Sequence, residues 1–365
     1  MDDRLVLFGL HEMEGIGWKT IRNVVSRVPL RELPRFGPEQ LAASGVPPRH
    51  AAAVAERFRN GFVEARLETY HRAGVNFVTV FDEGYPQLLK QTGQPPWVLY
   101  YKGDFARLNV PAIAVVGTRT PTAYGQRVAR MLAEQLSAAG VCVVSGLARG
   151  IDSWAHRGAL CGPGGTIAVL GGPADTVYPQ ENGPLYREIE QNGLIISEVP
   201  LGTPIHPGLF PLRNRIIAGL SLGTVIVEAA EKSGALITAD LALEESRDVF
   251  AVPGPVTSPK SAGPLALIRQ GAKMVASVEH ILEEYSHLLK MEHPAYIIKE
   301  IGECPPAPLT EDERRVLEWI GDVPVTVDEL LERSGFPFGH LHAVLLHLTM
   351  KNLVRPLPGF YYVRL

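Results

Sequence analysis

Four loops of this chain combine glycines with arginines in a way that suits the binding of an anion. They read GTRTPTAYG (117–125), SGLARGID (145–152), GGPADTVYPQEN (171–182) and PLGTPIHPGLFPLRNRIIAGLS (200–221). Glycine lets the backbone approach a phosphate closely, and the N–H groups that open a following helix attract negative charge. Arginine adds a planar fork of donors that matches phosphate oxygens. These loops therefore predict a site that binds phosphate groups.

The arginines on these loops or at a helix start are Arg119, Arg149, Arg213 and Arg215. We expect Arg119 and Arg213 to point into one crevice and to neutralise one phosphate each. The aromatic residues near these loops are Tyr124, Tyr178 and Phe210. They could stack on bases, a contact worth about 1 to 3 kcal/mol each, or pack against the loops. Both interpretations stay open at this point.

Catalytic machinery cannot be named from the sequence. GTRTPTAYG lacks the G-x-G-x-x-G spacing of a dinucleotide site, and neither a Walker P-loop nor a nucleophile elbow is found. The three cysteines, Cys142, Cys161 and Cys304, lack the spacing of a zinc site. His156 and His206 stand alone, so we expect structural roles for them. The sequence thus favours a non-enzymatic protein without a cofactor or a metal.

The composition describes a globular chain with two or three domains. Its 365 residues are 46% hydrophobic and 20% charged. We see no apolar run of about 20 residues, as a membrane span requires, and MDDRLVLFGL lacks the pattern of a secretory signal, so we expect a cytoplasmic protein without membrane contact. Because the net charge is −4, affinity for nucleic acid has to come from a local basic groove.

The elements that must position the loops follow an alternating pattern between residues 111 and 286. Short β-branched runs, typical of buried parallel strands, occur at 112–117, 141–146, 166–171, 194–199, 224–229, 248–253 and 273–277. Helical stretches lie between them, for example at 123–140. The pattern predicts a Rossmann-like, doubly wound parallel sheet. The glycine and arginine loops then meet in the crevice at the carboxyl ends of the strands.

Three further segments complete the predicted organisation. Residues 1–85 read as a small helical domain of the SAM or helix-hairpin-helix type, with 86–288 as the Rossmann-like domain. A proline-rich linker at 289–308 leads to a winged-helix domain at 309–365. In the first domain EGIGWKT (14–20) looks like a helix-hairpin-helix turn, which could bind a DNA phosphate; a helical domain without DNA contact is equally compatible.

The predicted third helix of the winged-helix domain, FGHLHAVLLHLTMKNL, is poor in arginine and lysine. Phosphate contacts need such cations, so we favour a regulatory or protein-contact role for this domain. The same observation argues against a sequence-specific regulator that reads DNA through this helix.

The order of the segments resembles the DprA (Smf) family over about residues 80–290. The resemblance is carried by GTRTPTAYG, VSGLARGID, YPQEN, SEVPLGTP, FPLRNRIIAGLS, VEAAEKSGALITA and FAVPG. It implies a protein that binds single-stranded DNA entering the cell during natural transformation, protects it, and loads the RecA recombinase for homologous recombination. It also implies a homodimer through the Rossmann-like domain. Members of this family are similar in having a basic pocket, which here would include Arg119, Ser145, Gly146, Arg149 and Arg213.

We therefore predict a single-stranded DNA site that consists of Gly117, Thr118, Arg119, Ser145, Gly146, Arg149, Gln180, Asn182, Phe210, Arg213, Asn214 and Arg215. Asn182 and Asn214 could instead cap backbone groups, as could Asp152. Two positions depart from the family pattern: Gln180 stands where many relatives have lysine, and GGP at 171–173 replaces a GSG-like loop. The pocket is expected to be less basic for that reason.

The main alternative is a nucleotide-processing enzyme of the phosphoribohydrolase (lysine-decarboxylase-like) type. Similar sheets with glycine loops occur there, and Glu228 could act as an acid. Such an enzyme would carry a PGGxGT-type run. This chain has EKSGALITA (231–239) in its place.

Overall fold

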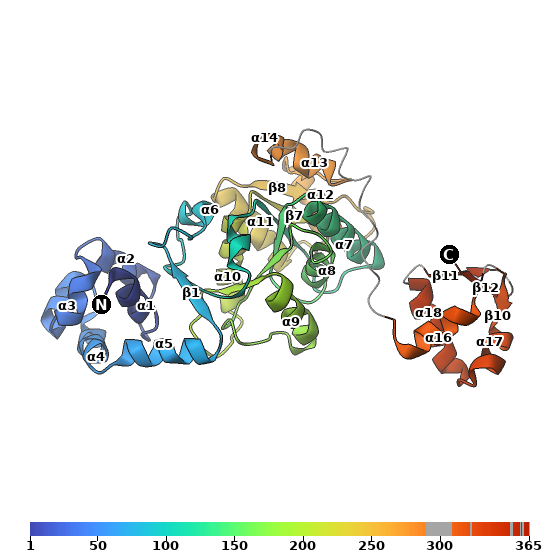
Figure 1. The fold of residues 1–365 in the computed structure, drawn as a ribbon. Coiled ribbons are helices and arrows are strands. Elements are labelled where there is room, and N and C mark those ends of the chain that lie inside the picture. The colour runs from blue at the N-terminus through green and yellow to red at the C-terminus, as the bar shows by residue number, and fades with distance from the viewer. Residues whose placement is uncertain (290–308, 322, 351–352, 358, 360, 365) are drawn as a thin grey trace. The chain divides into compact units, whose positions relative to one another are not determined.

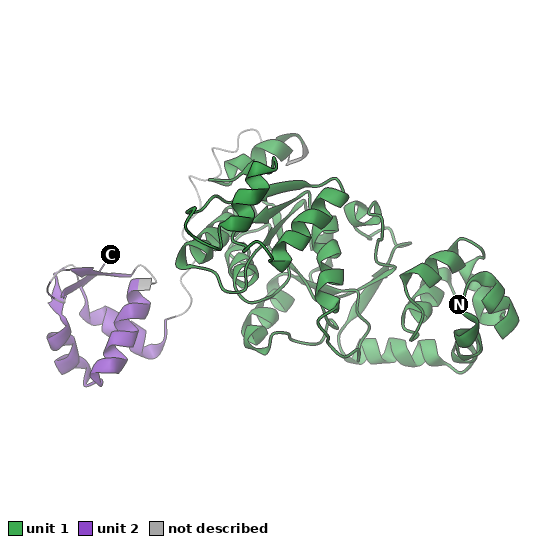
Figure 2. Cartoon of the chain, turned by 180° about the vertical axis from the view of Figure 1, so that it is seen from behind, with its two compact units in different colours: residues 1–300 green, residues 301–365 purple. Residues whose placement is uncertain are grey.

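The structure, a computed structural model, describes residues 1–289, 309–321, 323–350, 353–357, 359 and 361–364. The chain divides into two compact units, unit 1 (Met1–Glu300) and unit 2 (Ile301–Leu365), which Figure 2 distinguishes by colour. From residue 290 on, the linker predicted at 289–308 lies outside the described residues. The proposed domain boundary after residue 85 stays a prediction.

Unit 1 contains a nine-stranded sheet with the order β1-β2-β6-β5-β4-β3-β7-β8-β9 (Figure 1). The strands are β1 (Asn76–Thr79), β2 (Val98–Gly103), β3 (Ala112–Val116), β4 (Cys142–Ser145), β5 (Thr166–Val169), β6 (Leu194–Ser197), β7 (Gly223–Ile226), β8 (Asp248–Ala251) and β9 (Lys273–Met274). The pairs from β3 to β9 are parallel, which confirms the seven predicted strands. The sequence prediction did not include β1 and β2, which add antiparallel pairs at one edge.

The sheet is doubly wound because β4, β5 and β6 extend from one side of β3, and β7, β8 and β9 from the other. Both faces of β3 are covered, so all five of its residues are buried. Helices α7 (Ala123–Ala138) and α8 (Ile151–Ala159) share one apolar core with the sheet, whereas α10 (Leu209–Leu220) and α11 (Gly234–Glu244) share the core on the opposite face. This is the Rossmann-like architecture that the sequence predicted.

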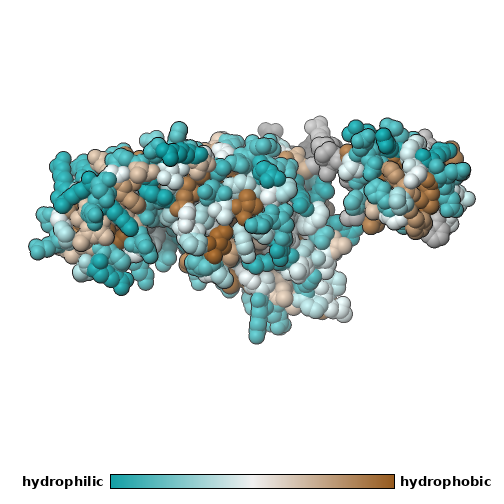
Figure 3. All heavy atoms as spheres, turned by 90° about the horizontal axis from the view of Figure 1, so that it is seen from below, coloured by the Kyte–Doolittle hydropathy of each residue, from teal (hydrophilic) through white to brown (hydrophobic). Residues whose placement is uncertain are grey.

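Shorter helical elements connect these parts. They are α6 (Gln87–Lys90), η2 (Phe105–Asn109), η3 (Gln180–Asn182), α9 (Gly183–Asn192), α12 (Ala262–Arg269), α13 (Glu279–Leu282), η4 (Glu283–Tyr285) and α14 (Ser286–Leu289). On the face seen in Figure 3, hydrophilic side chains dominate and apolar ones form small groups. No helix in the described ranges is both long and apolar enough to cross a membrane.

The first 72 residues of unit 1 form a group of helices, as the glycine and proline breaks predicted. They are α1 (Asp3–His11), α2 (Trp18–Val25), η1 (Leu30–Arg35), α3 (Pro38–Ser44), α4 (Pro48–Arg59) and α5 (Phe62–Arg72). The side chain of Asp2 caps α1, and α3 and α4 begin with proline, whose fixed backbone angle suits the first helical position. The EGIG turn, residues 14–17, joins α1 to α2.

Unit 2 is a winged-helix domain. Its elements are α16 (Glu311–Trp319), β10 (Val325–Thr326), α17 (Val327–Ser334), α18 (Phe338–Met350), β11 (Val354–Leu357) and β12 (Tyr361–Arg364). Thr310 and Thr326 each form a capping box with the glutamate three residues later, and these boxes fix the starts of α16 and α17. The strands pair in the order β10-β12-β11 and form the wing.

Candidate nucleic-acid interface

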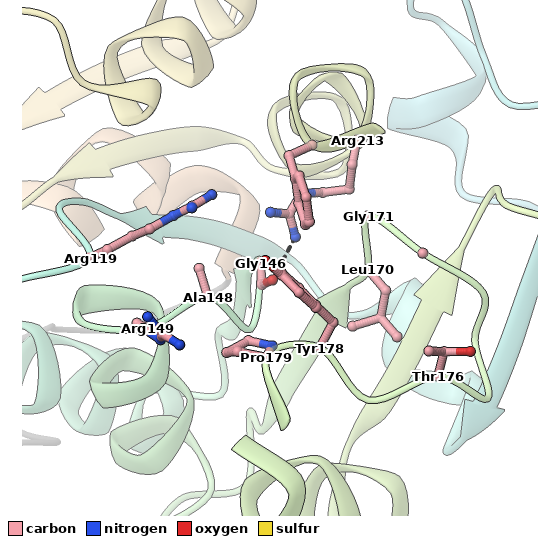
Figure 4. Close-up of a pocket in the computed structure, with 12 residues that line it drawn as sticks. Arg119, Gly146, Ala148, Arg149, Leu170, Gly171, Thr176, Tyr178, Pro179 and Arg213 are labelled. Atoms are coloured by element: carbon pink, nitrogen blue, oxygen red, sulfur yellow. Dashed lines mark hydrogen bonds between the residues drawn. The ribbon is translucent and has the colours of Figure 1, made fainter. Parts of the chain in front are cut away.

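A cavity with about 570 Å³ of open space lies at the carboxyl ends of β4 and β5. The side chains that give it its chemistry are those of Arg119, Arg149, Thr176, Tyr178, Phe210 and Arg213 (Figure 4). They come from all four glycine and arginine loops. The sequence therefore predicted correctly that these loops meet at one edge of the sheet.

A second cavity, with about 1100 Å³ of open space, shares Arg119, Tyr178, Phe210 and Arg213 with the first. It extends to the start of α11, where Ser233 caps the helix and accepts a hydrogen bond from the amide of Ala235. Thr238 of α11 also lines it, and its side chain is 2% exposed. We call the two cavities together the loop crevice.

Arg119 is an exposed cation of the loop crevice that has no carboxylate partner among the described residues. Within the described part of the chain its guanidinium has neither an ion pair nor a hydrogen bond, and it lies 5.7 Å from the centre of the Phe210 ring. That ring packs against Tyr178, with ring centres 5.3 Å apart and planes inclined by 36°. Tyr178 is 47% exposed. The crevice thus places an unpaired cation beside two accessible aromatic faces, which are the groups that phosphates and bases bind.

Arg213 lines both cavities, but it is only 7% exposed. Its Nη1 donates hydrogen bonds to the carbonyl oxygen of Gly146 at 2.6 Å and to that of Val169. Burial lowers the pKa of Arg213 to about 10, the charge of Asp152 opposes this shift, and the charge of Arg119 adds to it. Arg213 thus joins α10 to the ends of β4 and β5 and forms the floor of the crevice.

The loop after β4 is held in place by Asp152 and His156 of α8. One oxygen of Asp152 accepts hydrogen bonds from the amides of Gly146 at 3.1 Å and Ala148 at 3.4 Å. Nε2 of His156 accepts from the amide of Leu147 at 3.2 Å, and Leu147 has a φ of +54°, which is uncommon for a residue with a side chain. The loop therefore keeps a strained conformation because buried side chains of α8 bind its amides.

His156 is neutral and its tautomer is defined by its partners. Its Nδ1 lies 2.7 Å from the hydroxyl of Thr166, which donates to the carbonyl of Val143 and therefore accepts from the histidine. Burial lowers the pKa of His156 to about 3, and the charge of Arg213 adds to this shift. The expected structural role of His156 is thus the support of the loop after β4.

Two glycines of this loop have no room for a side chain. A Cβ on Gly146 would lie 2.4 Å from Nη1 of Arg213. Gly150 has a φ of +79°, and a Cβ there would lie 2.3 Å from the carbonyl oxygen of Thr118. These glycines let the loops after β3 and β4 and the side chain of Arg213 pack closely together.

Three more of the predicted site residues, Gly117, Thr118 and Ser145, lie at the ends of β3 and β4. Ser145 is fully buried and its hydroxyl donates to the carbonyl of Val115 at 2.7 Å, so it does not face the crevice. The amide of Thr118 donates to the carbonyl of Glu228 at 2.6 Å. Gly117 lines the second cavity.

The predicted polar residues after β5 and on α10 divide between inside and outside the crevice. Asn182 is buried and donates to the carbonyl of Leu147 at 2.9 Å and to the hydroxyl of Ser153 at 3.0 Å, so it supports the loop after β4 from behind. Gln180 is exposed at the start of η3 and lines neither cavity. Asn214 lines the second cavity.

Arg149 and Arg215 are both paired with carboxylates. Arg149 lines the first cavity and is exposed, and its Nη2 donates to Glu181 at 2.8 Å. Arg215 binds Glu198 and donates to the carbonyl oxygen of Gln94 at 2.7 Å. It lines neither cavity of the loop crevice, so the structure does not bring it together with Arg119.

Glu228 is placed poorly for catalysis. It is 3% exposed, and its two oxygens accept hydrogen bonds from the amide of Thr122, at 2.8 Å, and from the hydroxyl of the same residue. It lines neither cavity of the loop crevice. The described residues also hold no group of three or more His, Cys, Asp or Glu side chains that could bind a metal. Glu228 therefore fixes the start of α7, and the alternative enzyme lacks an accessible acid at this position.

Sequence reasoning left several lining residues out of the predicted site. The predicted DNA site contains none of four residues that line the crevice: Leu170, Thr176, Tyr178 and Thr238. The sequence suggested only that Tyr178 could stack on a base. Position along the chain could have indicated three of them. Leu170 directly follows β5, and Thr176 and Tyr178 belong to the GGPADTVYPQEN loop that comes next. Nothing in the sequence around Thr238 indicated a position in the crevice.

Comparison with known proteins identifies the family of the chain. The profile of the family "DNA recombination-mediator protein A" matches residues 76–286, and that of the DprA winged helix domain matches residues 303–359. Protein Smf of Escherichia coli is 39% identical over 305 residues, which are 82% of this chain and 80% of that protein. DNA processing protein DprA of Bacillus subtilis is 44% identical over 219 residues, covering 60% of this chain and 74% of the relative.

Solved structures show the same relationship. DNA processing protein A from Streptococcus pneumoniae has 32% sequence identity and a TM-score of 0.67, and the match covers 77% of this chain and 97% of that one. A structure of DNA processing protein A from Helicobacter pylori, which concerns the single-stranded DNA binding mode of that protein, has 32% identity and a TM-score of 0.54, covering 60% of this chain and 99% of that one. The chain therefore belongs to the DNA recombination-mediator protein A (DprA/Smf) family.

Proposed function

We propose that this protein binds single-stranded DNA in the loop crevice, without strong sequence preference and without converting the strand chemically. The observation that carries the proposal is the unpaired, exposed guanidinium of Arg119 beside the rings of Phe210 and Tyr178, which pack against each other at an angle. A cation and aromatic faces bind a phosphate backbone and unstacked bases, whereas they have no direct way to read the edges of a duplex. The relative from Helicobacter pylori supports the choice of DNA.

Family membership supports three finer proposals. The protein protects incoming DNA during natural transformation, loads RecA onto it for homologous recombination, and forms a homodimer through the Rossmann-like domain. It is proposed to act as a binding protein and not as an enzyme. Light scattering tests the dimer, because the monomer has a mass of 39.8 kDa.

The proposal is tested by titrating the protein with single-stranded and blunt double-stranded oligonucleotides at two salt concentrations. We expect tighter binding of the single strand and weaker binding at higher salt, because phosphate contacts release counterions. Equal affinity for the duplex would contradict the proposal. So would reproducible hydrolysis of DNA or nucleotides that Glu228→Gln abolishes.

Arg119→Ala is the variant that locates the binding site. If Arg119 neutralises one phosphate, its loss weakens binding to all sequences and lowers the salt slope by about 0.7 for single strands. Arg127→Ala is the matched control, because Arg127 is also exposed and lines neither cavity. Affinity that is unchanged for Arg119→Ala would remove the loop crevice as the binding site.

A further inference from the structure

A third cavity of unit 1, with about 1050 Å³ of open space, lies between the EGIG turn and α10. We call it the hairpin cleft. Its walls come from Ile16 and Trp18 at the EGIG turn, from Trp97 before β2, and from Leu209 and Leu212 of α10. The proposed function does not involve this cleft. The sequence, however, indicated that EGIGWKT (14–20) could be a DNA-binding turn, and three of its residues line the cleft.

The hairpin cleft adjoins the first cavity of the loop crevice. Leu170 and Arg213 line both the hairpin cleft and the first cavity of the crevice. Arg213 is therefore the boundary between the two, with its guanidinium bound to carbonyl groups on the crevice side. A strand that occupies the crevice therefore lies next to the hairpin cleft, on the other side of this wall.

The walls of the hairpin cleft are apolar. The indole N–H of Trp18 donates to the carbonyl of Pro95 at 2.7 Å, and that of Trp97 donates to the carbonyl of Trp18 at 3.1 Å. Both indoles therefore have their polar groups satisfied, and the surface that they offer to the cleft is hydrocarbon. Leu212 is 60% exposed and adds an accessible apolar side chain to the lining of the cleft.

Two charged groups of the hairpin cleft compensate each other, and the guanidinium of Arg213, the third, is bound to carbonyl groups on the crevice side. Arg215 and Glu198, the ion pair described above, both line it. Burial raises the pKa of Glu198, and the charge of Arg215 opposes this shift. The pair leaves no net negative charge to repel a phosphate backbone, and the carboxylate offers an acceptor to the amino groups of bases. A mostly apolar cleft with an acceptor at its wall suits a nucleobase.

We infer that the hairpin cleft receives nucleobases of the same DNA strand that occupies the loop crevice, so that the EGIG turn and α10 extend the interface beyond Arg213. This inference rests on the proposed function of the loop crevice. It predicts the path of the strand over the protein, from the ends of β4 and β5 to the start of α2. It also gives the exposed side chain of Leu212 a ligand to pack against.

The decisive experiment measures the affinity of Leu212→Ser for oligothymidylates of increasing length. Serine removes the apolar contact without changing the charge, and an exposed position tolerates it. We expect the variant to bind the shortest strands with wild-type affinity, because the loop crevice holds them alone. Strands long enough to enter the cleft should bind about tenfold more weakly, because the contact with the leucine side chain is lost. The matched control is Leu346→Ser in unit 2, because Leu346 is also 60% exposed.

The outcomes separate this inference from the proposed function. Arg119→Ala weakens the binding of short and long strands alike if the loop crevice binds DNA. If Arg119→Ala has that effect while Leu212→Ser binds every length like the wild type, the inference is wrong and the proposed function stands. If the wild type binds no single-stranded DNA, both fail.

Tryptophan fluorescence provides a second measurement that does not depend on α10. In the variant Trp154→Phe with Trp319→Phe, the remaining tryptophans, Trp18 and Trp97, both line the hairpin cleft. We expect long strands to quench their emission and short strands to leave it unchanged. Equal emission with long strands and without DNA would overturn the inference.

Discussion

At the scale of single residues, Arg119 and Arg213 carry the same charged group in different surroundings. Arg213 is held by two main-chain carbonyls and is nearly buried, whereas Arg119 is exposed and touches only an aromatic ring among its described neighbours. A buried cation with fixed acceptors contributes to stability, and an exposed one remains available to a ligand. The proposed binding role therefore falls to Arg119, whereas Arg213 holds the crevice floor in place.

Arg213→Ala is expected to destabilise unit 1. The substitution leaves the buried carbonyls of Gly146 and Val169 without their donor and opens space beneath the loop after β4, so we expect a loss of roughly 2 to 4 kcal/mol in the free energy of unfolding. Urea unfolding measures it, with Arg127→Ala as the control. A change below about 0.5 kcal/mol would show that the two carbonyl contacts do not hold the floor together.

His156 makes the stability of the fold depend on pH. Its pKa is about 3 in the folded chain and about 6.5 in an unfolded one, so the unfolded state binds the proton first as the pH falls. The contribution of neutral His156 is complete above pH 6.5 and decreases from there toward pH 3. At pH 5 the loss is about 2 kcal/mol.

Chemical unfolding at pH 7 and pH 5 tests this, with the wild type and His156→Gln side by side. Glutamine offers an acceptor to the amide of Leu147 but does not titrate. We expect a smaller decrease in stability for the variant between the two pH values. The same decrease in both proteins would mean that another group causes the acid sensitivity.

At the scale of elements, a buried polar network joins the first helices to the sheet. Glu12, directly after α1, accepts hydrogen bonds from Arg66 at 2.6 Å and Tyr70 at 2.7 Å of α5 and from Tyr100 of β2. The hydroxyl of Tyr70 also accepts from the amide of Leu201, in the loop that leads to α10. The carboxylate of Glu12 thus connects α1 and α5 to β2. The hydroxyl of Tyr70 connects α5 to the loop that leads to α10.

Tyr100→Phe tests the network with minimal disturbance of packing. The substitution removes the hydroxyl that donates to Glu12 and accepts from Nδ1 of His11, so we expect a loss of about 1 to 2 kcal/mol in the free energy of unfolding. Tyr101→Phe is the matched control, because Tyr101 is the next residue of the same strand and is only half-buried. Equal stability of the two variants would argue against the network.

At the scale of the whole molecule, the chain consists of two units, each with its own apolar core. The core of unit 2 is built from residues of α16, α17, α18 and β11, and the loop crevice and the hairpin cleft lie entirely in unit 1. Separate cores allow separate folding. The two units can therefore be tested independently.

Removal of residues 290–365 is expected to leave the DNA affinity within about twofold of the full chain, since every group proposed to bind DNA is in unit 1 and α18 is poor in cations. Titration with the same oligonucleotides measures the affinity, and the thermal transition of unit 1 controls for folding. A tenfold loss of affinity with an unchanged transition would place DNA contacts in the winged-helix domain.

The sequence alone determined the parallel sheet, the winged helix and the loops that meet in the crevice. Continuous apolar runs such as that of β3 are local signals, and the carboxyl ends of parallel strands share one edge whatever the details of packing. The edge strands β1 and β2 were not found because they precede the alternating pattern of strands and helices and are buried over only part of their length. Family resemblance added the ligand, which no local pattern specifies.

Only the tertiary structure decided which arginines line the loop crevice and which of them have a carboxylate partner. Arg213 and Arg215 are two residues apart on α10, yet one lines the crevice floor and the other binds Glu198 in a different cavity. Burial and partner carboxylates determine whether a guanidinium is free, and both come from segments distant in sequence. The same reason applies to Tyr178, whose contact with Phe210 joins two loops that the sequence could place at one edge but not against each other.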